Sequence, residues 1–193
     1  MPAPLILASS SMHRRALLER LQVPYEVCAP DIDESRAPDE RPADYVARLS
    51  REKAQAVATR YPQALIIGSD QAAVLDAAIL GKPGNRARAL EQLRQASGRC
   101  VEFYTGLTLL NAATGATQTS VVTTRVHFRQ LSDDTISRYL DKEQPYDCAG
   151  SFKSEALGIA LFERIEGDDP TALIGLPLIA LVGMLANQGV SIP

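Results

Sequence analysis

The sequence predicts an α/β fold in which helices flank a mixed central sheet. Short apolar runs at residues 5–8 and 65–68 are typical of strands buried on both faces. Residues 42–60 repeat their apolar side chains at helical spacing, whereas residues 100–128 alternate apolar and polar side chains. Strand and helix patterns that alternate along one chain indicate the α/β class.

The first part of the chain alternates strands and helices. Its serines at positions 9–11 are good N-cap candidates, and Pro42 suits the first turn of a helix. The predicted elements are a strand at 5–8, a helix at 13–21, a strand at 25–29, a helix at 42–60 and a strand at 65–68.

The second part adds hairpin and helix signals. Thr114 and Gly115 mark a turn between two long strands, and Ser132 caps a helix. The predicted elements are a strand at 74–80, a helix at 87–96, strands within 100–128, a helix after 132, a strand at 159–162 and a helix from 177 to 189.

Length and composition indicate a globular protein of one domain. The chain has 193 residues, of which 46% are hydrophobic and 22% charged. A formal charge of -3 gives no basic field for nucleic acid or an anionic membrane. We therefore expect neither as a partner.

The cysteines and the first residues favour a cytoplasmic protein. Three cysteines without a CxxC pair argue against a disulfide framework or a cysteine-rich zinc site. The start of the chain lacks the basic region and long apolar run of a secretory signal.

The first candidate binding feature is the turn after the opening strand. A helix N-terminus following a serine turn offers backbone N–H groups to a phosphate. Ser9 adds a hydroxyl, and Arg14 lies one turn into the helix. The alternative is an ordinary helix cap with surface arginines.

Two further candidates are a lysine and an aspartate beside buried segments. Lys53 shares the apolar stripe of its helix, so it either extends to the surface or points into a polar site. Asp70 directly follows the apolar run 65–68, and ligands of open α/β sheets bind at the carboxyl ends of strands. A capping or turn aspartate is the alternative.

Two loops complete the set of candidates. Lys82 lies between Gly81 and Pro83, and residues 151–155 form a polar stretch between apolar segments. Either could be an ordinary surface loop. Together the candidates supply cations, hydroxyls and carboxylates, as a triphosphate with a divalent cation requires. Neither a dinucleotide-binding GxGxxG motif nor a P-loop is present in the sequence.

An ordered set of short motifs then identifies a family. The chain resembles the Maf family of nucleotide pyrophosphatases along almost its whole length. The motifs are Leu-Ile-Leu-Ala-Ser-Ser-Ser at 5–11 with arginines at 14 and 15, Asp-Glu at 33–34, Glu-Lys-Ala at 52–54, Ile-Gly-Ser-Asp-Gln at 67–71, Gly-Lys-Pro at 81–83, Tyr-Thr-Gly at 104–106 and Ala-Gly-Ser at 149–151.

The resemblance implies a single Maf-like domain, residues 1–193, with two lobes around a deep cleft. It also implies a cytoplasmic enzyme that uses Mg²⁺ or Mn²⁺ and frequently forms a homodimer. Asp70 matches the catalytic carboxylate that activates water, and Glu34 and Asp70 are the expected metal ligands. The positions that line the phosphate site are Ser9, Arg14, Lys53 and Lys82.

The resemblance also favours one branch of the family. Ser-Asp-Gln at 69–71 and Gly-Ser-Phe-Lys-Ser-Glu at 150–155 look like the branch that hydrolyses 7-methyl-GTP. The positions that track the base are His13, Gln71 and Glu155. His13 departs from the arginine or tryptophan common in related proteins.

The expected reaction splits 7-methyl-GTP into 7-methyl-GMP and diphosphate, with Asp70 as general base and a house-cleaning role against modified nucleotides. One alternative is a dTTP or UTP pyrophosphatase of the same family. Another is a nucleotide-binding regulator of cell division with little turnover. A third is a structural α/β domain with scattered surface charges.

Overall fold

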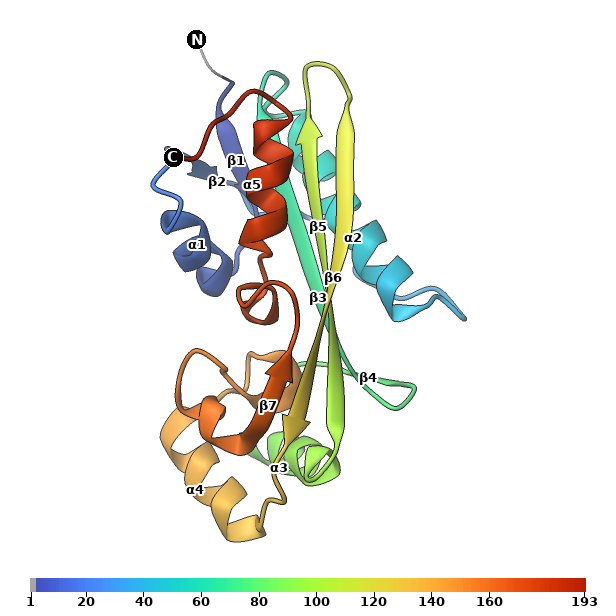
Figure 1. The fold of residues 1–193 in the computed structure, drawn as a ribbon. Coiled ribbons are helices and arrows are strands. Elements are labelled where there is room, and N and C mark those ends of the chain that lie inside the picture. Colours follow the sequence, from blue (N-terminus) through green and yellow to red (C-terminus); the bar gives the residue numbers. More distant parts are fainter. Residues whose placement is uncertain (1–2) are drawn as a thin grey trace. The chain divides into compact units, whose positions relative to one another are not determined.

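A computed structural model describes residues 3–193 and divides the chain into two compact units. Unit 1 comprises residues 1–70, 105–122 and 169–193, and unit 2 comprises residues 71–104 and 123–168. The predicted α/β class is confirmed, because the described residues form five α-helices and a mixed sheet of seven strands (Figure 1). The two-lobe arrangement with a cleft stays a prediction from the resemblance.

The sheet has the strand order β2-β1-β3-β5-β6-β7, and β4 pairs with β3. Strand β1 runs parallel to both β2 and β3, whereas the pairs β3–β4 and β6–β7 are antiparallel. The strands are β1 (Leu5–Ala8), β2 (Glu26–Val27), β3 (Leu65–Leu75), β4 (Ala78–Leu80), β5 (Cys100–Asn111), β6 (Thr117–Phe128) and β7 (Phe162–Glu166).

The helices mostly match the predicted segments. Ser11, Asn85 and Ser132 each accept a hydrogen bond from a backbone N–H in the first turn of α1, α3 and α4. The helices are α1 (Met12–Glu19), α2 (Pro42–Ala58), α3 (Arg86–Ala96), α4 (Asp133–Glu143) and α5 (Leu178–Ala186). In residues 3–193 no helix combines the length and apolarity needed to cross a membrane.

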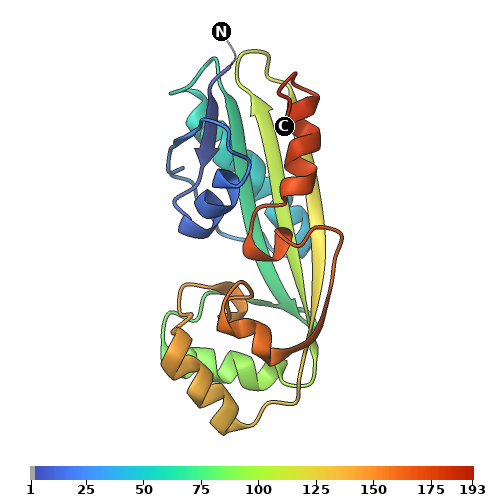
Figure 2. The same cartoon turned by 60° about the vertical axis from the view of Figure 1, so that its left-hand side comes forward.

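Unit 1 has a core on each face of its part of the sheet. Leu5 and Leu7 face α1 and α5, whereas Ile6 and Ala8 face α2. Figures 1 and 2 show α5 and α2 on opposite faces of these strands. This two-sided burial explains why β1 appears in the sequence as an uninterrupted apolar run.

Unit 2 is built around an aromatic core. Phe152 packs edge-on against Phe103, Phe128 and Phe162, with ring centroids 4.7–5.6 Å apart. Helices α3 and α4 pack together, and Arg94 of α3 forms a bidentate ion pair with Asp133 of α4 at 2.8 Å.

Three strand predictions were wrong in detail. The segment 74–80 is not one strand, because a turn at 76–77 reverses it between β3 and β4. The strand predicted at 25–29 is reduced to Glu26–Val27. Residues 157–161, predicted to be partly strand, form a 3₁₀ turn, because the Ile159 N–H bonds to the nearby carbonyl of Ala156.

Candidate active site

The predicted site residues divide between the two units. Unit 1 contains Ser9, His13, Arg14, Glu34, Lys53 and Asp70, and unit 2 contains Gln71, Lys82 and Glu155.

Asp70 lies inside a strand and not after its end. The prediction of a strand that stops near residue 68 was wrong, because β3 continues to Leu75 and pairs there with β4. The pairing of β3 with β1 does stop, since its last pair is Ala8 with Gly68. Asp70 therefore lies just past the carboxyl end of the parallel strand β1, where an α/β sheet offers space for a ligand.

Lys53 contacts both candidate metal-binding carboxylates of unit 1. Its Nζ atom lies 2.5 Å from Oδ1 of Asp70 and 2.8 Å from Oε1 of Glu34. Lys53 is 6% exposed and Asp70 is 8% exposed. The lysine thus points into a polar site, and the alternative of a lysine that reaches the surface is excluded. A turn or capping role for Asp70 is excluded as well.

A close contact between α2 and β3 places Lys53 over Asp70. A Cβ atom at Gly68 would lie 2.0 Å from the carbonyl oxygen of Ser50 in α2. Only a residue without a side chain therefore allows the helix to approach the strand this closely. Lys53 lies one turn after Ser50, so its side chain extends along the sheet to Asp70.

Helix α2 also holds the acidic loop that carries Glu34. The Tyr45 hydroxyl donates to the Glu34 carbonyl at 2.8 Å, and Arg48 donates to the Ser35 carbonyl at 3.0 Å. Arg48 forms a further ion pair with Glu40 at 2.8 Å. One helix thus supplies a cation of the site and anchors the loop that brings the second carboxylate.

Arg14 approaches the same carboxylates from α1. Its Nε atom donates to the Gly175 carbonyl at 2.9 Å. Burial lowers the pKa of the guanidinium, and the negative charges of Asp70 and Glu34 oppose this shift. The two carboxylates therefore compensate part of the cost of burying the arginine charge.

The serine turn acts as a helix cap in this structure. The Ser11 side chain accepts from the Arg14 N–H at 3.4 Å, and the buried Ser9 Oγ accepts from the Ser11 N–H at 3.1 Å. The capping alternative is thus confirmed for Ser11. A phosphate contact of Ser9 stays a prediction.

The carboxylates of unit 1 suit the expected cation. Glu34 and Asp70 each place an oxygen within 2.8 Å of one ammonium nitrogen, so the two oxygens converge. Carboxylate oxygens are the protein ligands that Mg²⁺ and Mn²⁺ prefer, and phosphate oxygens and water commonly complete such a site. The donor set therefore fits the cation, although the ion itself stays a prediction.

In unit 2 the two predicted loops lie together. The Gln92 side chain donates to the Gly81 carbonyl at 2.9 Å and accepts from the Ser151 hydroxyl at 2.5 Å. The structure thus joins the loop that carries Lys82 to the segment that carries Glu155. Both side chains are exposed, and Gln71 is partly buried.

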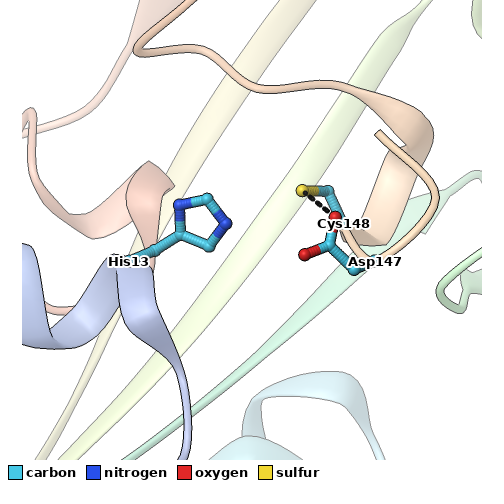
Figure 3. A group of neighbouring side chains, drawn as sticks. All are labelled: His13, Asp147 and Cys148. Carbon is cyan, nitrogen blue, oxygen red and sulfur yellow. Dashed lines mark hydrogen bonds between the residues drawn. The ribbon is translucent and has the colours of Figure 1, made fainter. Parts of the chain in front are cut away.

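The cysteines of the described chain are free, as expected from their number and spacing. Cys148 donates its thiol hydrogen to Asp147, with Sγ and Oδ1 3.4 Å apart (Figure 3). Burial, assisted by the negative charge of Asp147, raises the pKa of Cys148 to about 12. The thiol therefore stays protonated near neutral pH. His13, also drawn in Figure 3, belongs to α1 of unit 1.

Sequence reasoning missed several residues that support the site. Tyr45 and Arg48 belong to the helix that carries Lys53. They are three residues apart, so their spacing could have indicated that these two side chains lie on one face of the helix. Ser69 donates a single proton between the carbonyls of Gly106 and Gly175, at 2.8 and 2.9 Å. Asp169 is 3% exposed, and the Asp-x-Thr pattern at 169–171 is a known turn signal.

Comparisons with known proteins agree with the resemblance. The family described as Maf-like protein matches residues 4–188. A 7-methyl-GTP pyrophosphatase of Alkalilimnicola ehrlichii is 62% identical over 186 residues, covering 96% of this chain and 94% of the relative. The proteins of that name from Pseudomonas syringae and Pseudomonas aeruginosa are 58% and 57% identical over 189 residues, covering 98% of each chain. The chain therefore belongs to the Maf family.

Proposed function

We propose that this protein hydrolyses the α–β phosphoanhydride bond of 7-methyl-GTP and releases 7-methyl-GMP and diphosphate. The observation that carries the substrate is the 62% identity, over 96% of the chain, to a relative named 7-methyl-GTP pyrophosphatase. The cluster of Asp70, Lys53 and Glu34 supports the chemistry. Within this proposal the enzyme removes a modified nucleotide before it can be used.

The charges of the four candidate site residues in unit 1 indicate that a bound triphosphate requires a divalent cation. Arg14 and Lys53 are cations, and Glu34 and Asp70 are anions, so these four side chains balance one another. A bound triphosphate adds negative charge that they do not neutralise. We propose that Glu34 and Asp70 hold Mg²⁺ or Mn²⁺, which supplies the missing positive charge when bound.

Asp70 is the proposed general base. Lys53 holds its Oδ1 atom, which fixes the orientation of the carboxylate. In the proposal Oδ2 accepts the proton of a water molecule as the oxygen of that water attacks the α-phosphorus. The bond from the α-phosphorus to the bridging oxygen breaks, and diphosphate leaves with the electron pair of that bond. Arg14 and Lys53 stabilise the charge that develops on the phosphate oxygens.

The remaining assignments rest on the sequence. Ser9 and Lys82 are proposed to bind phosphate, and Gln71, Glu155 and His13 to select the base. A carboxylate at 155 can accept both the N1–H and the 2-amino group of guanine. Methylation at N7 makes the ring cationic and strengthens these hydrogen bonds. A cytoplasmic location and a homodimer also remain predictions.

The test compares hydrolysis of 7-methyl-GTP, GTP, dTTP and UTP with Mg²⁺ and with Mn²⁺, followed by chromatographic separation of the products. Fastest conversion of 7-methyl-GTP to monophosphate and diphosphate supports the proposal. Faster cleavage of dTTP or UTP would overturn the substrate but keep the reaction. Nucleotide binding without cleavage of any of the four would favour the alternative of a nucleotide-binding regulator. The absence of nucleotide binding would favour the alternative of a structural α/β domain.

A further inference from the structure

The Gly175 carbonyl connects two parts of the candidate site that are distant in sequence. It accepts a hydrogen bond from Arg14 Nε at 2.9 Å and from Ser69 Oγ at 2.9 Å. Arg14 belongs to α1, and Ser69 directly precedes Asp70 on β3. One backbone oxygen thus fixes the proposed phosphate-binding arginine relative to the strand that carries the proposed base.

A buried aspartate closes the loop that presents this carbonyl. Asp169 accepts from the Thr171 N–H through Oδ1 and from the Ile179 N–H through Oδ2, both at 2.8 Å. The first contact holds the start of the loop, and the second holds the first turn of α5. The carboxylate therefore ties both ends of residues 169–179 together.

The Thr171 hydroxyl lies at the centre of the same loop. It accepts from the Leu178 N–H at 2.9 Å, and its own proton lies between Asp169 Oδ1 at 2.6 Å and the Leu176 carbonyl at 2.8 Å. Thr171 thus contacts residues on both sides of Gly175. These contacts hold the backbone on both sides of Gly175 and thereby restrain the position of its carbonyl.

The backbone at Gly175 is shaped to meet Arg14. Its φ of +121° is unfavourable for residues with a side chain, and a Cβ there would lie 3.4 Å from Arg14 Nε. The contact uses Nε, so neither terminal amino group of the guanidinium is needed for the hydrogen bond to Gly175. Asp70 and Glu34 both act electrostatically on this guanidinium.

We propose that Asp169 and Thr171 are positioning residues for Arg14. They hold the Gly175 carbonyl in place, and the carbonyl directs the terminal amino groups of the arginine toward the phosphates of the substrate. This inference rests on the proposed function, because it assigns Arg14 to phosphate binding. A flexible arginine side chain that is oriented before binding loses less freedom when the substrate arrives.

The test is a double-mutant cycle between Thr171→Val and Arg14→Lys. Valine keeps the shape of threonine but removes the hydroxyl, and lysine has no Nε–H to donate to Gly175. We expect Thr171→Val alone to lower kcat/KM by up to roughly 100-fold. In the Arg14→Lys background the same change should have almost no further effect. Thr171→Ser keeps the hydroxyl and should restore activity.

Effects that multiply in the double variant would overturn the proposal, because a merely structural role would weaken both backgrounds equally. If Thr171→Val does not fold, Gly175→Ala provides the same test. Gly189→Ala is its control, since Gly189 also has a positive φ, +76°, and has no atom within 4 Å of a Cβ.

A second readout separates this inference from the proposed function. Binding of inorganic diphosphate with Mg²⁺ is measured by calorimetry for the wild type, both single variants and the double variant. If the wild type hydrolyses no nucleotide, the proposed function fails, and the same non-additivity in diphosphate binding still supports the positioning of Arg14. Additive losses in diphosphate binding would overturn it.

Discussion

Lys53 Nζ lies 2.5 Å from Asp70 Oδ1, and both side chains are almost completely buried. A buried ion pair is costly to desolvate and gives little net stability compared with an apolar pair. Its presence in unit 1, together with Glu34 at 2.8 Å from the same nitrogen, therefore indicates function more than stability.

Asp70→Asn should keep the fold and remove most turnover. Asparagine has nearly the shape of aspartate but cannot accept the proton of water as a general base. We expect kcat for the best nucleotide to fall ~10²–10⁴-fold. Diphosphate release measures the rate, and a thermal melt confirms that the variant is folded. A kcat within about threefold of the wild type would show that Asp70 is not the base.

Lys53→Met should destabilise the protein by about 3 kcal/mol, because it leaves the Asp70 carboxylate buried with less compensation. Adding Asp70→Asn should recover part of this loss, because the uncompensated charge is then removed. Urea unfolding measures all three variants. The control is Arg41→Ala, which should change the free energy of unfolding very little, because its pair with Asp44 at 2.6 Å is exposed to solvent. No recovery in the double variant would contradict the buried-charge explanation.

Gly68→Ala should separate α2 from β3. The new Cβ would lie 2.0 Å from the Ser50 carbonyl, which is backbone and cannot rotate away. We expect a loss of about 1–3 kcal/mol in stability and a lower kcat, since Lys53 would shift relative to Asp70. Calorimetric melting and the hydrolysis assay measure the two effects.

The control for that variant is Gly183→Ala within α5, where a Cβ has no atom within 4 Å. It should be neutral or stabilising, because alanine favours helix more than glycine does. Equal changes in stability and in kcat for the two variants would mean that neither quantity depends on the close approach of α2 to Gly68.

The pair of Glu40 and Arg48 should make stability depend on pH. The hydrogen bond from Arg48 holds the pKa of Glu40 below its usual range. A lowered native pKa stabilises the fold above the unfolded value of about 4.3, and the contribution is lost as the pH falls through the native pKa. Glu40→Gln should therefore melt below the wild type at neutral pH, and the difference in melting temperature should shrink as the pH falls below about 4.3 and through the lowered native pKa of Glu40.

The control for Glu40→Gln is Glu163→Gln, an exposed position on β7. Melting temperatures of all three proteins are compared between neutral pH and pH ~3. If the melting temperatures of Glu40→Gln and the wild type differ by the same amount over this pH range, the ion pair of Glu40 with Arg48 is not the cause of that difference.

Glu155→Gln should weaken the binding of 7-methyl-GTP more than the binding of a pyrimidine nucleotide. The amide has one acceptor oxygen and no charge, so it cannot accept both guanine donors equally well. We expect KM for 7-methyl-GTP to rise about tenfold or more, with little change for UTP. Steady-state kinetics on both substrates measure this. Equal losses for the two nucleotides would exclude Glu155 as the residue that recognises the base.

Much of the fold could be predicted because the signals are local. The apolar run of β1 and the N-cap Ser132 depend on neighbouring residues, so both are visible in the sequence. The continuation of β3 past Asp70 was missed, because its partner changes from β1 to β4 within the strand. Strand pairing depends on residues distant in sequence and leaves no local pattern.

The sequence by itself determined the α/β class, the ordered motifs of the Maf family and the residue types of the candidate site. Only the tertiary structure decided that Lys53 pairs with Asp70 and Glu34, and that Gly175 holds Arg14. Side-chain chemistry is a property of each residue, whereas an ion pair depends on how closely a helix approaches a strand. That approach is possible here because Gly68 has no Cβ atom.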